Sequence, residues 1–444
     1  MNYRKLAAIA AALTMLTSAV SCGSDSDGGD TADTTSAVSA EASTDASGES
    51  ATTGTGTTTT SKKSDKTTTE KTTKSSKTTT TTAKAGSSAS GSTAAGGNSS
   101  GGSSGGSSGG AATTQAASGG GSSSQETTSE SGEKVYDGEI KLGSSPTVSG
   151  SGVTVDGKTV TITTGGDYIF TGTVSDGQIR VNVPGDDENV SIVLNGVDIS
   201  NSTAPAIYIE DAKRCTIKPK DGSVNYLSSD CEKKGNKEAG AIFSNDTVRL
   251  KGNGTLNITA TAAHGINSDD DVIIESGTYV INSRKSGIIT NNGVTMNDGD
   301  VTIFGGTNGI KAKGDDDEVG TININGGTMH IAGGTKEEKH SIYAAVFNYS
   351  GGTVFAAGNK FTAPSTSASP YVGFGFKNGG TADTNLTFYV NGKEVGSLTP
   401  HKDFMSAVMF LPDLKVGDTV AISVNGKKSE EFIVEGTKNE FTVA

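Results

Sequence analysis

A five-residue phrase recurs at a constant spacing in the middle of the chain. Three copies that start 22 residues apart are Gly265-Ile266-Asn267-Ser268-Asp269, Gly287-Ile288-Ile289-Thr290-Asn291 and Gly309-Ile310-Lys311-Ala312-Lys313. Each copy is followed by two short runs of alternating apolar and polar residues, which a glycine turn separates. Strands this short cannot bury an apolar face alone, but they form a continuous core when they stack on their counterparts. The repeat therefore predicts a unit of three short strands that stacks on itself.

The same register extends over a longer part of the chain. The isoleucine of the phrase has counterparts at Ile179, Ile207, Ile242, Ile266, Ile288, Ile310 and Ile342. No run keeps a helical period over the roughly 10–12 residues that a helix needs. An antiparallel sandwich has no reason to keep a 22-residue register, so the pattern favours a parallel β-helix over residues 134–365. The longer intervals indicate loops inserted after Lys220, Gly314 and Gly334.

The register ends near residue 362, and longer alternating runs follow it. Residues 366–444 contain two Asn-Gly dipeptides, Asn391-Gly392 and Asn425-Gly426. Asn-Gly between alternating apolar runs is the strongest short signal for a β-hairpin. We therefore predict a small antiparallel β module that caps the last rung.

The first 133 residues have a different character. Residues 1–22 are typical of a lipoprotein signal peptide, because a short basic start and a weakly apolar run lead to Ala19-Val20-Ser21-Cys22. Cys22 would then carry the lipid, although Ala19 stands where Leu is usual and a plain secretory signal is the alternative. Residues 23–133 are rich in Ser, Thr and Gly, which predicts a disordered linker. We therefore expect a lipid-anchored protein on the outside of a bacterial cell membrane.

Composition narrows the class of protein further. Only 32% of the residues are hydrophobic, Trp is absent and there are 62 glycines, which disfavours an ordinary helical enzyme. Residues 134–444 carry 27 Lys and Arg against 37 Asp and Glu, so a nucleic-acid partner is not expected. Cys215 and Cys231 could form a disulfide in an exported protein, and the sequence leaves this open.

Several of these segments resemble one bacterial family. They are Gly166-Asp167-Tyr168-Ile169-Phe170-Thr171-Gly172, Val193-Leu194-Asn195-Gly196-Val197, Gly254-Thr255-Leu256-Asn257-Ile258 and Gly265-Ile266-Asn267-Ser268-Asp269-Asp270. The family consists of carbohydrate-binding surface proteins of plant-cell-wall degraders, and the resemblance covers residues 136–444. It implies an all-β fold, a right-handed parallel β-helix similar to pectate lyases. It also implies calcium as a cofactor and binding of cellulose and polygalacturonate.

The chain departs from the family at one position of the phrase. The family usually has Asp before Gly-Ile, whereas His264, Ser286 and Asn308 stand there in this chain. If those Asp residues bind ions in relatives, this chain has fewer or weaker ion sites. We expect His264 itself to be a surface or turn residue.

Polar residues that follow the phrase form a candidate calcium site. Alignment on Gly-Ile places Asn245, Asp269, Asn291 and Lys313 in one column, and Asp246, Asp270 and Asn292 in the next. Equivalent positions of stacked rungs lie about 4.8 Å apart. Calcium takes roughly six to eight oxygen ligands, which carboxylates and amides supply. The predicted ligands are Asn245, Asp246, Asp269, Asp270, Asn291 and Asn292, with Asp315-Asp316-Asp317 as a second acidic cluster. A ladder of hydrogen bonds that only stabilises the corner is the alternative.

Three functions fit these patterns. The first is binding of plant cell-wall polysaccharides, with acidic pectin (polygalacturonate) expected before cellulose, because an acidic domain could hold the pectin through bridging calcium. Without Trp a strong stacking platform for cellulose is not expected, and Tyr208, Tyr279 and Tyr343 are predicted to pack in the core. The second is a calcium-dependent lyase, and the third is an adhesive surface protein. No spacing marks a base among Arg284, Lys285, Lys311 and Lys313, so we expect a binding protein without catalytic residues.

Overall fold

The computed structural model describes residues 134–444 apart from 186–187, 236, 316–317, 335 and 337. The predicted signal peptide at 1–22, its Cys22 and the predicted linker at 23–133 therefore lie outside the described residues. Every regular element in the described ranges is a β-strand. No helix long and apolar enough to cross a membrane occurs in these ranges.

The repeated phrase forms the first face of a parallel β-helix. Ile266 pairs with Ile242 on one side and with Ile288 on the other, and the ladder continues through Ile310 to Ile342. The predicted register is therefore confirmed, and these isoleucines are buried in one continuous core. The nine strands of this face are β3 (Val153–Asp156), β4 (Thr159–Ile162), β6 (Gln178–Asn182), β8 (Ile207–Asp211), β13 (Gly240–Ser244), β16 (His264–Ser268), β19 (Ile288–Thr290), β22 (Ile310–Ala312) and β25 (Ile342–Tyr343).

The second and third faces belong to one 20-stranded sheet, because two long strands near its start turn the corner between the faces. One of them, β7 (Asn189–Asn201), pairs with a second-face strand along its first half and with a third-face strand along its second half. The second face contains β9 (Arg214–Pro219), β14 (Val248–Leu250), β17 (Val272–Ile274), β20 (Gly293–Met296), β23 (Thr321–Ile324), β26 (Val346–Tyr349) and β28 (Thr366–Ser367).

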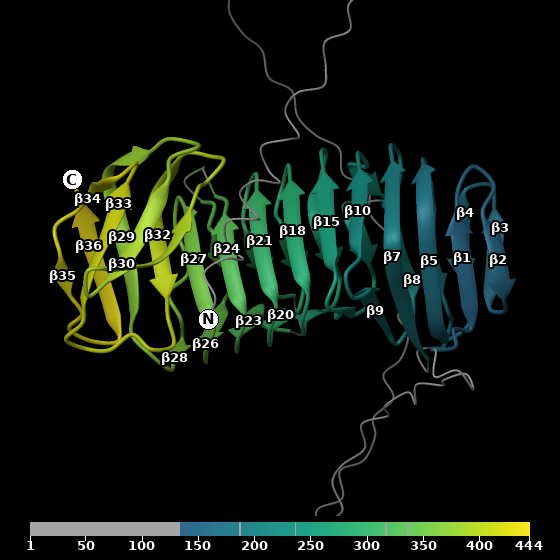
Figure 1. Ribbon diagram of the computed structural model, residues 1–444, viewed down its shortest axis with the longest axis horizontal. Coiled ribbons are helices and arrows are strands. Elements are labelled where there is room, and N and C mark those ends of the chain that lie inside the picture. Colours follow the sequence, from purple (N-terminus) through teal and green to yellow (C-terminus); the bar gives the residue numbers. More distant parts are fainter. Residues whose placement is uncertain (1–133, 186–187, 236, 316–317, 335, 337) are drawn as a thin grey trace, which may run out of the picture. The chain divides into compact units, whose positions relative to one another are not determined.

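The third face is the row of strands that Figure 1 shows side by side from β5 to β27. Its strands are the second halves of β5 (Gly166–Ser175) and β7, then β10 (Val224–Ser229), β15 (Thr255–Ala260), β18 (Thr278–Ser283), β21 (Asp300–Gly305), β24 (Thr328–Ala332) and β27 (Thr353–Gly358). The first strand of the chain, β1 (Gly138–Leu142), pairs with the first half of β5 and so extends the second face. At the start of the helix, β2 (Thr147–Gly150) pairs antiparallel with β1, and β3 pairs antiparallel with β4. Glycines at one corner allow the rungs to approach closely: Gly299 has φ of 108°, and a Cβ there would lie 2.8 Å from the Gly277 carbonyl oxygen.

The largest insertion does not lie where the sequence placed it. A loop was expected after Lys220, but the chain there makes only a short turn before β10. Most of the additional residues follow β10 instead and form a hairpin of β11 (Lys233–Lys234) and β12 (Lys237–Glu238). The later two insertions lie where predicted, between β22 and β23 and between β24 and β25.

Residues 371–444 form a β module close to the predicted 366–444, in which the pairings are antiparallel except for the parallel pair of β29 and β36. Its strands are β29 (Tyr371–Gly380), β30 (Leu386–Val390), β31 (Lys393–Leu398), β32 (Phe404–Phe410), β33 (Thr419–Val424), β34 (Lys427–Lys428), β35 (Phe432–Ile433) and β36 (Lys438–Val443). Both Asn-Gly dipeptides form two-residue hairpin turns with positive φ. The module has its own apolar core, and β32 pairs antiparallel with β27, the last third-face strand of the β-helix.

The structure also tests the core packing that the sequence predicted for three tyrosines and the disulfide that it left open for two cysteines. Tyr279 is fully buried in the core, as expected, but Tyr208 and Tyr343 alternate with inward isoleucines and face outwards. Tyr343 is 36% exposed, so core packing was wrong for it. Cys215 and Cys231 are both buried free thiols, so no disulfide joins them.

The isoleucine stack generates a stability prediction. Ile288→Ala removes a fully buried side chain between two stacked isoleucines, which should cost roughly 2–5 kcal/mol of unfolding free energy. Ile273→Ala on β17 is the matched control, because Ile273 is only half-buried on the outer side. Chemical denaturation should separate the two variants clearly. Equal losses would show that the inward stack is not the main source of stability.

Candidate functional site

A polar groove of about 260 Å³ lies on the outer side of the first face. The β11–β12 hairpin supplies two of its residues, β16 supplies two, and the turns after β16, β19 and β22 supply the rest. The lining residues are Lys237, Glu238, His264, Asn267, Asp269, Asn291 and Lys313. Asp269 and Asn291 come from the predicted ligand set. The groove therefore combines part of the predicted corner with the β11–β12 hairpin, which belongs to the insertion that was expected after Lys220.

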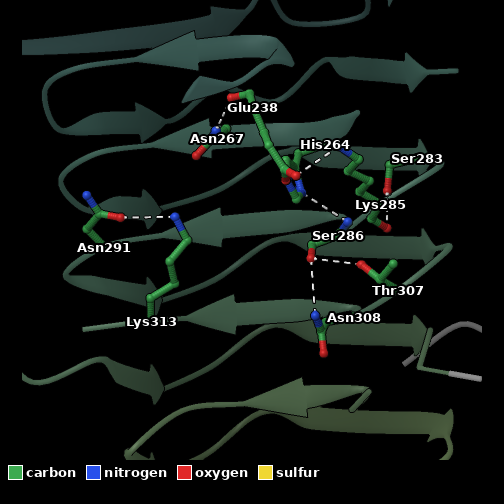
Figure 2. Close-up of polar contacts among 10 residues, drawn as sticks. All are labelled: Glu238, His264, Asn267, Ser283, Lys285, Ser286, Asn291, Thr307, Asn308 and Lys313. Atoms are coloured by element: carbon green, nitrogen blue, oxygen red, sulfur yellow. Dashed lines mark hydrogen bonds and ion pairs between the residues drawn. The ribbon is translucent and has the colours of Figure 1, made fainter. Parts of the chain in front are cut away.

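A buried histidine organises one wall of this groove (Figure 2). The Ser286 backbone N–H donates to His264 Nδ1 at 3.0 Å, so Nε2 carries the proton and donates to Glu238 Oε2 at 2.6 Å. Lys285 Nζ contacts the other Glu238 oxygen at 3.0 Å. His264 is only 3% exposed and belongs to β16, so the expectation of a surface or turn residue was wrong.

The electrostatics of this wall favour a neutral histidine beside an ionised glutamate. Burial lowers the pKa of His264, and Lys285 and Lys313 lower it further, although Glu238 opposes them. Burial alone would raise the pKa of Glu238, but hydrogen bonds from His264 and Lys285 outweigh burial and hold this pKa at about 2. Glu238 therefore remains a carboxylate at any ordinary pH, and its negative charge is already satisfied by the protein.

Like His264, the other two residues that stand before Gly-Ile in the phrase, Ser286 and Asn308, are buried. Ser286 and Asn308 lie in the column of His264, and Asn308 Nδ2 donates to Ser286 Oγ at 3.3 Å. Asn308 Oδ1 accepts the His340 backbone N–H at 3.0 Å. The column is a chain of neutral hydrogen-bonding groups, and its members already have protein partners.

The predicted calcium ligands do fall into two neighbouring columns. Ser268 pairs with Ser244 and with Thr290, which places the residues that follow each of them in register. In the first column, Asn245 Nδ2 donates to the Glu210 carbonyl at 2.8 Å, and Lys313 Nζ donates to Asn291 Oδ1 at 3.2 Å. Asp269 forms an ion pair with Lys237.

The second column is also held by hydrogen bonds. Asn292 Nδ2 donates to Asp270 Oδ1 at 2.5 Å, and the Thr247 hydroxyl donates to Asp270 Oδ2. Asp246 Oδ2 accepts the Ala212 backbone N–H at 3.0 Å. Of the second acidic cluster, Asp316 and Asp317 lie outside the described residues.

The oxygen donors of these columns are of the type that calcium prefers, but their arrangement does not fit a resident ion. Two lysines stand among the ligands, and the carboxylates of Asp246, Asp269 and Asp270 each accept from a protein donor. Within the described ranges no group of three or more His, Cys, Asp or Glu side chains is placed to hold a metal ion. Calcium at this corner stays a prediction from the sequence.

Lysines surround the groove beyond those that line it. Lys311 lies on β22 with its Nζ 4.8 Å from the centre of the Tyr343 ring. Burial lowers the pKa of Lys311, and the nearby charges of Lys339 and Lys313 lower it further. This first-face surface therefore presents a cluster of cations beside one exposed aromatic ring, within a domain whose total charge is negative.

These features define a parallel β-helix with a polar groove on its outer surface. The family described as carbohydrate-binding domain-containing protein matches residues 156–370. A carbohydrate-binding domain-containing protein of Acetivibrio thermocellus is 32% identical over 217 residues, covering 42% of this chain and 75% of the relative. The chain therefore belongs to the carbohydrate-binding domain family. A solved polysaccharide lyase-like protein from C. thermocellum is 28% identical with a TM-score of 0.43, covering 52% of this chain and 99% of that one.

The lowered pKa of Glu238 generates a pH prediction. A carboxyl whose pKa is lowered by folding stabilises the fold above its unfolded pKa and loses this effect as the pH falls towards its folded value. Glu238→Gln should therefore lower the unfolding midpoint at neutral pH. The difference in unfolding midpoint between this variant and the wild type should narrow as the pH falls from 4.5 to about 2. Thermal unfolding across this range measures it.

The matched control is Glu394→Gln on β31, because Glu394 is exposed and has no ion pair among the described residues. This control should follow the wild type at every pH. If the difference in unfolding midpoint between Glu238→Gln and the wild type does not change with pH, the charge of Glu238 does not stabilise this wall.

Proposed function

We propose that the chain is a non-catalytic binding protein for plant cell-wall polysaccharides, with acidic pectin (polygalacturonate) as its main ligand and cellulose as a second one. Family membership supports a carbohydrate ligand. The observation that carries the preference for an acidic polymer is the cluster of lysines at the first-face groove. Its members are Lys237, Lys285, Lys311, Lys313 and Lys339.

The charges available to a ligand differ among these lysines. Lys285 is bound to Glu238, and Lys237 is paired with Asp269. Lys313 contacts only the neutral Asn291 amide among the described side chains, and it is exposed at the rim. A carboxylate of the polymer can therefore pair with Lys313 without breaking an existing ion pair, and a charge-assisted hydrogen bond of this kind is stronger than a neutral one.

Tyr343 adds an apolar surface to this cation cluster. Its ring is partly exposed beside Lys311, and the His340 ring packs against it in a T-shaped pair with centroids 5.0 Å apart. One face of a sugar ring is apolar and can lie against such an aromatic ring. Sugar units placed along successive rungs would meet Tyr343, Lys311 and Lys313, since these residues come from adjacent strands.

The lysines supply the test of this proposal. Lys237→Gln with Lys313→Gln should weaken polygalacturonate binding at low salt by roughly tenfold, which corresponds to about 1.4 kcal/mol. Affinity electrophoresis in gels with polygalacturonate measures the change. The control is Lys393→Gln with Lys427→Gln, which makes the same charge change in the two Asn-Gly hairpins. If both double variants bind polygalacturonate like the wild type, the first-face groove is not the binding site.

Calcium is a separate proposal, in which the ion bridges polymer carboxylates to Asp269 and Asp270. The same electrophoresis separates it from direct binding by lysine. If calcium bridges, Asp269→Asn and a chelator each weaken binding, because both remove the bridge. If lysine binds directly, a chelator has no effect, and Asp269→Asn preserves or strengthens binding because Lys237 loses its partner.

One observation favours a second candidate function, a polysaccharide lyase. Lys311 has a lowered pKa, and a lysine poised closer to neutral is better suited to abstract the proton beside a uronate carboxylate. Incubation with polygalacturonate and calcium, followed by ultraviolet absorbance of the unsaturated product, distinguishes this function from binding alone. A product that disappears in Lys311→Ala would establish the lyase.

We also propose that the protein is displayed on the bacterial surface through a lipid on Cys22, with residues 23–133 as a spacer. The basis is the sequence pattern that ends at Cys22. Cys22→Ser should move the mature protein from the membrane fraction to the medium, and immunoblotting of the two fractions measures this. A variant that still fractionates with the membrane would remove the lipid anchor from the proposal.

A further inference from the structure

A second groove of about 330 Å³ lies at the third face, and it shares no lining residue with the first. The ends of β15, β18, β21 and β24 form its floor, and the loop between β31 and β32 forms one wall. The lining residues are Thr259, Ala260, Thr261, Asn282, Ser283, Arg284, Phe304, Gly305, Gly306, Ala332, His401 and Lys402. Its volume is at the small end of the range for ligand pockets, which begins near roughly 300 Å³.

An outward-facing aromatic residue stands at the centre of this groove. On β21, Val301 and Ile303 point into the core, so Phe304 points out of the sheet. Its neighbours in register are Asn282 on one side and Ala332 on the other. A large apolar ring between a polar and a small neighbour leaves room for a flat partner above the sheet.

The C-terminal module fixes one side of the Phe304 ring. The His401 ring lies 4.1 Å from it between centroids, with an angle of 38° between the planes. His401 Nδ1 lies 3.1 Å from Asp383 Oδ1, and Asp403 Oδ1 accepts the Ala382 backbone N–H at 2.9 Å. The wall is therefore held by the module's own contacts, and the groove does not depend on a mobile side chain.

Two cations at the groove have no anionic partner among the residues that the structure describes. Arg284 follows β18 and Lys402 follows His401, and both are exposed. Neither forms an ion pair with a described carboxylate, although residues 134–444 contain more acidic than basic groups. Both positive charges lie beside the Phe304 ring in the same groove and are available to an anionic ligand there.

We propose that this groove is a second carbohydrate site that binds one or two uronic acid units. The Phe304 ring lies against the apolar face of a sugar, and the guanidinium of Arg284 binds its carboxylate in the bidentate manner typical of Arg. Lys402 binds a second carboxylate, and Asn282 and Thr259 face the hydroxyl groups. The inference rests on the proposed function in one respect, the acidic nature of the polysaccharide.

The site is a property of this chain rather than of the matched family segment. The family match ends at residue 370, and His401 and Lys402 lie beyond it in the C-terminal module. The floor belongs to the β-helix and the wall to the module, so the groove exists only where both are present. Two sites on one chain would let a long polymer gain affinity by binding both, whereas a short oligomer gains nothing from the second.

Digalacturonate is the probe for this site, with isothermal titration calorimetry as the measurement. The wild type should bind it at least roughly tenfold more tightly than a neutral galactose disaccharide. Arg284→Gln with Lys402→Gln should weaken digalacturonate binding by at least roughly tenfold, and so should Phe304→Ser. The matched control is Lys393→Gln with Lys427→Gln in the two Asn-Gly hairpins, which makes the same charge change away from both grooves and should leave digalacturonate affinity within about twofold of the wild type.

The outcomes separate this inference from the proposed function. Wild-type protein that binds polygalacturonate but not digalacturonate, or that binds digalacturonate equally in the Arg284 and Lys402 variant, overturns the second site alone. Protein that binds neither acidic ligand overturns the proposed function as well. The charge variant changes only exposed side chains, so it remains informative if Phe304→Ser fails to fold.

Discussion

The parallel ladder depends on one repeated contact, an inward isoleucine that stacks on the isoleucine of the rung before and the rung after it. Each strand of the first face is two to five residues long and could not persist alone. The stack from Ile179 to Ile342 fixes the register of every rung, and the register in turn fixes which residues face outwards. The columns of outward side chains and the corner glycines follow from this single alignment.

Because the core uses only the inward positions, the outward positions are free to carry function. Both grooves are built in this way, but each needs a segment that is not part of the repeat. The first groove needs the β11–β12 hairpin, which brings Glu238 to the buried His264. The second needs the loop that carries His401 to Phe304. The repeat supplies a regular surface, and the irregular insertions hollow two places on it into grooves.

The sequence predicted the periodic part of the structure and missed what depends on contacts between distant segments. The 22-residue spacing was sufficient for the β-helix, and Asn-Gly was sufficient for the two hairpins of the module. The largest insertion was placed too early in the chain. Gly222 and Gly235 both supply a turn between Ile207 and Ile242, and the length of this interval does not show at which turn the additional residues lie. His264 was expected at a surface or turn, and only contacts with the hairpin, which brings Glu238 to it, account for its burial. The 35-residue interval before Ile242 was the signal that an additional segment lies against the first face.

The antiparallel pairing of β32 with β27 has a consequence for how copies of the protein can associate. A stack of parallel rungs ends in a strand whose backbone N–H and C=O groups are ready to accept another strand, and identical stacks can join end to end into fibres. At one end β32 occupies that edge and leads the chain into a module with its own core. At the other end the antiparallel β1–β2 and β3–β4 pairs interrupt the repeat. The third-face ladder is therefore closed to a second copy at the β32 end, and the first face ends there in the two-residue β25, which offers a neighbouring molecule little edge to pair with.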